Sequence, residues 1–305
     1  MSDGATLTVS NAKPMAVSLK GAASVTEDSE LSIYGAFTAA ELDLTGSKFM
    51  LEMDPKLVDG KNKPKAQSVT INGKGTDSCL DAAEMVVAGK MSVTGNLELK
   101  NKSIIRLYDP SGKNAAMPLA VKGNLTVGSG CSLTLSGALS AANLTLDGGS
   151  INLTGTKPQT IKVSNQLAIN ASTDINFNFT VTAKDANKKA FKILTFKTIG
   201  EYVEGDFVAW TDEDESISES LLELLGLENA GCTLTLDVKK KNISLTVNDL
   251  EAWESAMEDG EDVAASKEIP TPTALAALPV VPDFSPVADA LVQANWGLLS
   301  AYYSI

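Results

Sequence analysis

Short segments in which apolar and polar residues alternate recur along most of the chain, with Asn or Gly at the entrance of the clearest ones. These cover residues 95–99, 123–127 and 142–146, and weaker relatives cover residues 42–44, 69–71 and 165–169. Alternation places the apolar side chains on one face of an extended strand. Neighbouring copies lie about 19 to 28 residues apart, an interval typical of repeat architectures.

Further strands of the same type fall between these copies, at residues 17–19, 31–33, 131–135 and 151–153. Each repeat therefore holds two or three strands. One coil of a parallel β-helix is built in this way, because each strand stacks on its equivalent in the next coil and the inward Leu, Ile and Val side chains form columns. The pattern predicts an all-β chain arranged as a parallel β-helix.

The asparagines at the strand entrances have a physical reason to recur. Asn tolerates left-handed backbone conformations, and its amide can bond to the amide one coil above. We therefore predict an asparagine ladder through Asn96, Asn124 and Asn143. In the next copy Asn165 is displaced by one position and Gln166 directly precedes the strand, so the ladder is expected to end there.

From about Asp185 the pattern changes. Residues 191–196, 232–238 and 243–247 alternate as strands, and residues 218–226 indicate a short helix with Ser near its start and Gly past its end. We expect one β-helical domain over residues 1–250, in which the last part, residues 185–250, covers the open end of the hydrophobic core.

Two further segments follow this domain. Acidic and proline-rich residues 251–285 predict an extended linker, and residues 286–305 have helical spacing.

Charge and missing residue types exclude several functions. The net charge is −13 and Arg106 is the only arginine, so nucleic acid, which needs clustered basic side chains, is excluded as a partner. The chain has no histidine, which rules out Ser-His-Asp and Cys-His catalysis and histidine metal sites. We expect no catalytic, cofactor-binding or metal-binding residues, and we interpret the acidic residues 212–215 as a solvated surface.

Cysteine spacing points to core residues instead of a disulfide framework. The three cysteines, Cys79, Cys131 and Cys232, are far apart and odd in number, a pattern that favours small buried side chains. A bridge between Cys79 and Cys131 stays open, because spacing in the sequence does not give the distance between their Cα atoms.

Residues 285–297 carry a resemblance to a known family. Their Ala-Leu-Val-x-x-Asn-Trp-Gly core, with Leu291, Asn295, Trp296 and Gly297, resembles the junction between passenger and β-barrel in bacterial autotransporters. The repeats resemble autotransporter-associated β-strand repeats. This resemblance implies a right-handed, pectin-lyase-like β-helix carried outside the cell. The full-length protein would then be anchored in the outer membrane by its own C-terminal β-barrel, which is absent here, and its signal peptide would also lie outside this chain.

The resemblance and the absence of a catalytic constellation lead to one functional expectation. The chain is interpreted as a non-enzymatic cell-surface passenger for adhesion or surface presentation, whose partner is an unidentified host or cell-surface glycan or protein. One alternative is a polysaccharide lyase or hydrolase, for which Asp43, Asp109 and Asp147 with Arg106 are candidates. A third is a structural solenoid spacer without a binding patch.

Overall fold

The computed structural model describes residues 4–9, 13–53, 64–155, 157–210 and 217–256. These residues belong to one compact unit, Met1–Ala264, and form an almost entirely β structure with long parallel sheets. The second unit, Ala265–Ile305, lies outside the described residues. The four junction residues Leu291, Asn295, Trp296 and Gly297 and most of the predicted linker therefore also lie outside them.

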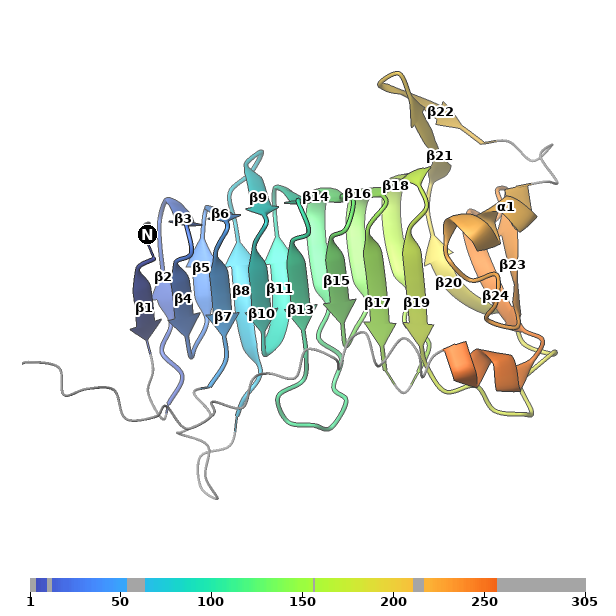
Figure 1. Cartoon of the computed structure of the whole chain (residues 1–305), viewed down its shortest axis with the longest axis horizontal. Helices are drawn as coiled ribbons and strands as arrows, with labels where there is room; N and C mark the ends of the chain where they lie inside the picture. Colours follow the sequence, from blue (N-terminus) through green and yellow to red (C-terminus); the bar gives the residue numbers. More distant parts are fainter. Residues whose placement is uncertain (1–3, 10–12, 54–63, 156, 211–216, 257–305) are drawn as a thin grey trace, which may run out of the picture. The chain divides into compact units, whose positions relative to one another are not determined.

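The first sheet has eight strands, all paired in parallel (Figure 1). In spatial order they are β1 (Thr6–Val9), β4 (Glu30–Ile33), β7 (Lys48–Leu51), β10 (Glu84–Val87), β13 (Ile104–Leu107), β15 (Ser132–Leu135), β17 (Ser150–Thr154) and β19 (Asp174–Asn178). Spatial order follows chain order, but two strands of the other sheet intervene between most neighbours. The chain thus leaves this sheet after each strand and returns to it one position further on.

The second sheet has sixteen strands, of which fourteen form two series and two, β24 (Asn242–Val247) and β23 (Cys232–Asp237), continue from β20. One series is β2 (Val17–Ser18), β5 (Phe37–Ala39), β8 (Gln67–Ile71), β11 (Gly89–Val93), β14 (Leu119–Val127), β16 (Leu139–Asp147), β18 (Ile161–Ala171) and β20 (Phe191–Thr195). The other is β3 (Ala22–Thr26), β6 (Glu41–Thr45), β9 (Asp77–Asp81), β12 (Asn96–Lys100) and the second halves of β14, β16 and β18, followed by β21 (Thr198–Val203) and β22 (Asp206–Ala209).

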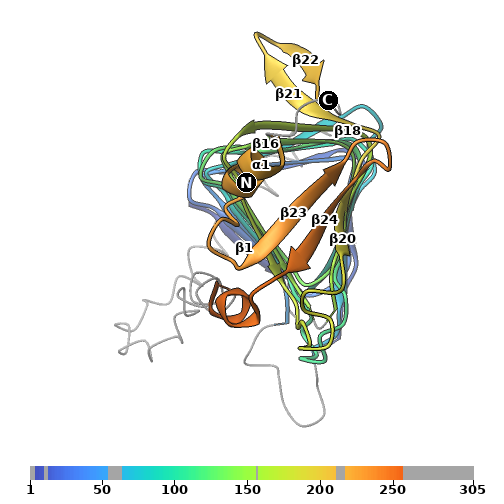
Figure 2. The same ribbon diagram turned by 90° about the vertical axis from the view of Figure 1, so that its right-hand side faces the viewer.

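The long strands β14, β16 and β18 join these two series, because each shifts register near its middle. Seen along the stacking direction, the parallel strands lie on three sides (Figure 2). Gly89 lies at a bend between the two sheets, where a Cβ atom would come within 2.0 Å of the carbonyl oxygen of Gln67. Only glycine fits such a close backbone approach.

Apolar side chains fill the space between the sheets in columns. Leu31, Phe49, Met85, Ile105 and Leu133 occupy equivalent positions of successive first-sheet strands, and all are buried. Alternating strands bury every second residue, and stacking in register brings these residues together, so one continuous hydrophobic core forms. The buried rings of Phe37 and Phe49 meet edge to face, with centroids 5.0 Å apart, which links the two sheets.

The C-terminal part changes to antiparallel pairing. β20 pairs with β24 (Asn242–Val247), and β24 pairs with β23 (Cys232–Asp237). Helix α1 (Ile217–Leu224) is followed by Gly226, whose φ of 64° suits the left-handed position after a helix. No helix among the residues seen in the structure has the length and apolar character needed to cross a membrane.

The compact part continues past residue 250. Residues 250–256 are helical, and the side chain of Trp253 is 1% exposed. Its ring packs on Phe179, with centroids 5.4 Å apart. The sequence pattern places this segment in a linker because it is acidic, yet its one large aromatic residue joins the core.

Candidate functional site: the asparagine ladder and the acidic face

The three predicted ladder asparagines lie in one column where the second sheet bends. Asn96 opens β12, and Asn124 and Asn143 follow the register shifts of β14 and β16. The backbone N–H of Asn124 donates to Oδ1 of Asn96 at 2.7 Å, and Nδ2 of Asn143 donates to Oδ1 of Asn124 at 2.7 Å. Each amide thus ties its strand to the next strand, as a ladder requires.

The ladder extends further than the sequence indicated. At one end Nδ2 of Asn96 donates to Oδ1 of Asp77 at 2.6 Å, and at the other Nδ2 of Asn165 donates to Oδ1 of Asn143 at 2.8 Å. Asn165 therefore belongs to the ladder, although its displacement by one position in the sequence suggested that the ladder stops before it. β18 contains one more residue than β16 at the bend, so Gln166 takes the register position while Asn165 still reaches its neighbour.

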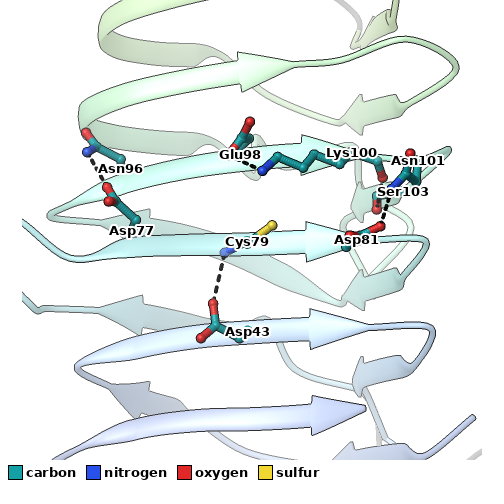
Figure 3. Close-up of polar contacts among 9 residues, drawn as sticks. All are labelled: Asp43, Asp77, Cys79, Asp81, Asn96, Glu98, Lys100, Asn101 and Ser103. Carbon is teal, nitrogen blue, oxygen red and sulfur yellow. Dashed lines mark hydrogen bonds and ion pairs between the residues drawn. The ribbon is translucent and has the colours of Figure 1, made fainter. Parts of the chain in front are cut away.

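Beside the start of the ladder lies the acidic face, which we define as Glu41, Asp43, Asp77, Asp81 and Glu98 on β6, β9 and β12. Figure 3 shows the last four of these side chains. Its carboxylates bond across and along the strands. Oδ1 of Asp43 accepts from the backbone N–H of Cys79 at 3.2 Å, and Oδ1 of Asp81 accepts from Nδ2 of Asn101 at 2.6 Å. Lys100 pairs with Glu98 at 2.9 Å. These contacts give the carboxylates a structural role.

The electrostatics of this face argue against a reactive group. Partial burial raises the pKa of the Cys79 thiol, and Glu98, Asp81 and Asp43 raise it further, while Lys100 opposes them. A thiol with a raised pKa stays protonated near neutral pH and is a poor nucleophile. Desolvation and the neighbouring Asp43 also raise the pKa of Glu41, as expected for carboxylates placed side by side.

The candidate residues for polysaccharide chemistry do not come together. Asp43 lies on β6, and Asp147 ends β16 ahead of Gly148, so both belong to the second sheet but to distant strands. Arg106 lies on β13 of the first sheet. General acid and base groups must both lie at one substrate, and these positions do not provide that.

Asp109 closes a turn after β13. Its carboxylate accepts from the backbone N–H groups of Ser111, Lys113 and Ala115 at 2.9, 3.1 and 2.8 Å. These hydrogen bonds, led by that of Ala115, lower the pKa of Asp109, because they stabilise its charged form. Asp109 is therefore committed to the turn, as its Asp-Pro-Ser-Gly sequence indicated.

All three cysteines are free, so Cys79 and Cys131 form no bridge. Cys131 is buried, whereas Cys79 and Cys232 are only partly buried, so the expectation of three buried cysteines holds for one. Burial raises the pKa of Cys232 to about 11. Within the described ranges no group of three or more Cys, Asp or Glu side chains is arranged to hold a metal ion. The acidic residues 212–215 lie outside those ranges.

Two polar features escape the sequence patterns. On the first sheet Nδ2 of Asn176 donates to Oδ1 of Asn152 at 2.7 Å, forming a second, shorter ladder between β17 and β19. The hydroxyl of Tyr108 donates to Oε2 of Glu52 at 2.7 Å, across the intervening strand β10. Asn152 and Asn176 both occupy outward positions of alternating strands, and this shared position in the sequence could have predicted their pairing. No sequence signal pairs Tyr108 with Glu52, 56 residues away.

Comparison of the chain with protein-family models, with curated proteins and with solved structures finds no significant match. Its function must therefore be argued from its own residues.

Proposed function

We propose that this chain is the right-handed parallel β-helical passenger of a bacterial autotransporter, and that it acts at the cell surface without catalysis, in adhesion or surface presentation. One observation carries the proposal. In the first sheet, from β1 to β19, every strand pairs in parallel and in register with the strand one repeat further on. A chain that repeats one strand arrangement this many times gains an extended scaffold.

The order of the strands supports the β-helix. From β4 the chain runs through β5 and β6 on the second sheet and returns to the first sheet as β7, which pairs with β4. Connections between parallel strands of one sheet are right-handed in roughly 98% of cases, which favours a right-handed coil. The ladder at the bend adds side-chain bonds between successive coils.

The cell-surface location rests on the sequence of residues 285–297 with its resemblance to the autotransporter junction. The arrangement of the acids supports a non-enzymatic role. Asp109 is held by its turn, and Asp43 binds the neighbouring strand. A polysaccharide-acting enzyme gains no support from these contacts.

The location is tested on intact cells of the organism that produces the protein. Antibodies raised against residues 13–250 should label unpermeabilised cells, and external proteinase K should abolish the labelling. A cytoplasmic protein probed in the same samples must remain intact. Labelling that requires permeabilised cells would overturn the proposal. Labelling that survives the protease would also overturn it, provided that the same protease digests the purified folded chain in solution.

Adhesion is tested separately, with a strain that lacks the gene. Binding of this strain to host cells and to sister cells should fall, and should recover when the gene is restored. Unchanged binding in both assays would favour the structural spacer.

A further inference from the structure

A hollow of about 360 Å³ opens beside the asparagine ladder, over β14, β16 and β18. We call it the lysine hollow, and its lining residues are Val121, Lys122, Ser140, Ala141, Ala142, Lys162, Val163, Ser164 and Thr195. Its volume lies in the range of roughly 300–1,000 Å³ that is common for small-molecule sites. The hollow belongs to neither the acidic face nor the ladder.

The central strand creates the space. β16 contributes Ser140, Ala141 and Ala142, all small, whereas the flanking strands contribute Lys122 from β14 and Lys162 from β18. Strands two apart in a sheet are separated by about 9.5 Å. The two lysines therefore lie on opposite sides of the small residues of β16. The register shifts of all three strands fall at this point.

The lining has two layers of different polarity. Val121, Ala141 and Val163 are at most 5% exposed and belong to the hydrophobic core beneath the sheet, so among the lining residues Ala142 is the apolar side chain that the hollow exposes. Around it stand the exposed lysines Lys122 and Lys162 and the hydroxyls of Ser140, Ser164 and Thr195. None of the lining residues is acidic. Among the described residues, neither lysine has a carboxylate within salt-bridge distance. Two unpaired cations at one hollow are unexpected in a chain of net charge −13.

We infer that the lysine hollow binds a glycan residue that carries a carboxylate. The methyl group of Ala142 and the methylene stems of the two lysines suit the C–H face of a sugar ring, the hydroxyls suit its hydroxyl groups, and the ammonium groups suit the carboxylate. The neighbouring ladder extends the match. Asn143 and Asn165 each use one amide N–H within the ladder, and an amide has two, which leaves one for an adjacent sugar hydroxyl. The inference rests on the proposed surface function, since it names the class of partner.

The test is calorimetric titration of the purified chain with a hexasaccharide of alternating glucuronate and N-acetylglucosamine. The matched ligand is the same hexasaccharide with its carboxylates reduced to alcohols. Binding to the acidic form is expected at low salt, with Kd at least tenfold higher for the reduced form. Because exposed ion pairs are weak, Lys122→Gln and Lys162→Gln should each raise Kd about fivefold, and 0.5 M salt should weaken binding further.

The control variant is Lys90→Gln, an exposed lysine on β11 of the same sheet but outside the hollow. It should leave Kd unchanged, and thermal melts should show that all three variants fold. The inference is overturned by absent binding, by equal binding of the reduced form, by an equal effect of Lys90→Gln, or by equally tight binding of a hexaglutamate peptide. None of these results bears on the intact-cell assay, so the two proposals fail separately.

Discussion

The two ends of the parallel stack are finished differently. At the β19 end, Leu224 is the last residue of α1 and Leu225 follows it. Their backbone carbonyls accept from the backbone N–H groups of Thr173 and Ile175 at 2.7 and 3.2 Å, respectively. The outer edge of β19 is thereby covered, together with two carbonyls that a helix end leaves unpaired. At the near end β1 is the outermost strand, and the apolar residues Leu7, Met15 and Leu19 are 48, 46 and 41% exposed.

The difference shows how a stack of parallel strands obtains its stability. Each strand is buried only when strands lie on both of its sides, so an edge has half of the contacts of the interior. At this end the residues that close α1 cover β19, the antiparallel strand β24 covers β20, and Phe179, which follows β19, packs on Phe191 and Trp253. The described residues around β1 lack such a cover. Local opening should therefore begin at β1.

The largest expected effect is at the capped end. Trp253→Ala removes a ring that is 1% exposed and contacts Phe179, and should lower the free energy of unfolding by about 3–5 kcal/mol in urea titrations. Trp253→Phe is the control. Nε1 of Trp253 is buried without a hydrogen-bond partner in the described structure, so losing it costs little, and the change should be about 1 kcal/mol. Equal losses in both variants would contradict this account.

A leucine pair compares the ends directly. Leu225→Ala at the cap truncates a fully buried side chain and should cost about 2–5 kcal/mol. Leu7→Ala makes the same chemical change on β1, where the side chain is already 48% exposed, and should cost less than about 0.5 kcal/mol. Urea unfolding of both variants measures the difference. Comparable losses would show that the two ends are equally well packed.

Tyr108 probes the middle of the stack. Burial, and then its bond to Glu52, raises the pKa of this tyrosine. Tyr108→Phe should cost about 1.5 kcal/mol at pH 7, because the acceptor is a carboxylate. A tyrosine in the unfolded chain ionises above about pH 10, while the folded one stays protonated, so the unfolded state gains stability first. The advantage of the wild type over Tyr108→Phe should therefore shrink above pH 10. An advantage that is constant with pH would refute the pKa shift.

The sequence predicts the repeating parts of this molecule better than its ends. Alternation identified about half of the stacked strands, and the Asn in equivalent positions identified the column of Asn96, Asn124 and Asn143, because both patterns are local. The extra residue in β18 was not predictable, since register depends on the neighbouring strand. Trp253 was missed because one aromatic in an acidic segment has no periodicity. Lys122 and Lys162 are 40 residues apart in the sequence and line the same hollow only because β14 and β18 both pair with β16, so no local pattern predicts the hollow.

A smaller effect than at Trp253, Leu225 or Tyr108 is expected in the ladder, which runs through the interior and reaches neither end. Asn124→Ala removes the Oδ1 that accepts from Asn143, and should cost about 1 kcal/mol, because the bond is exposed and water replaces it. Asn124→Asp keeps an acceptor at that position and should cost less. Amide exchange at β12, β14 and β16 should accelerate only in the alanine variant, while exchange at β1 and β19 stays as in the wild type. If exchange at β1 also accelerates, the ladder helps to hold the open end, and the contrast between the two ends is smaller than the exposed side chains indicate.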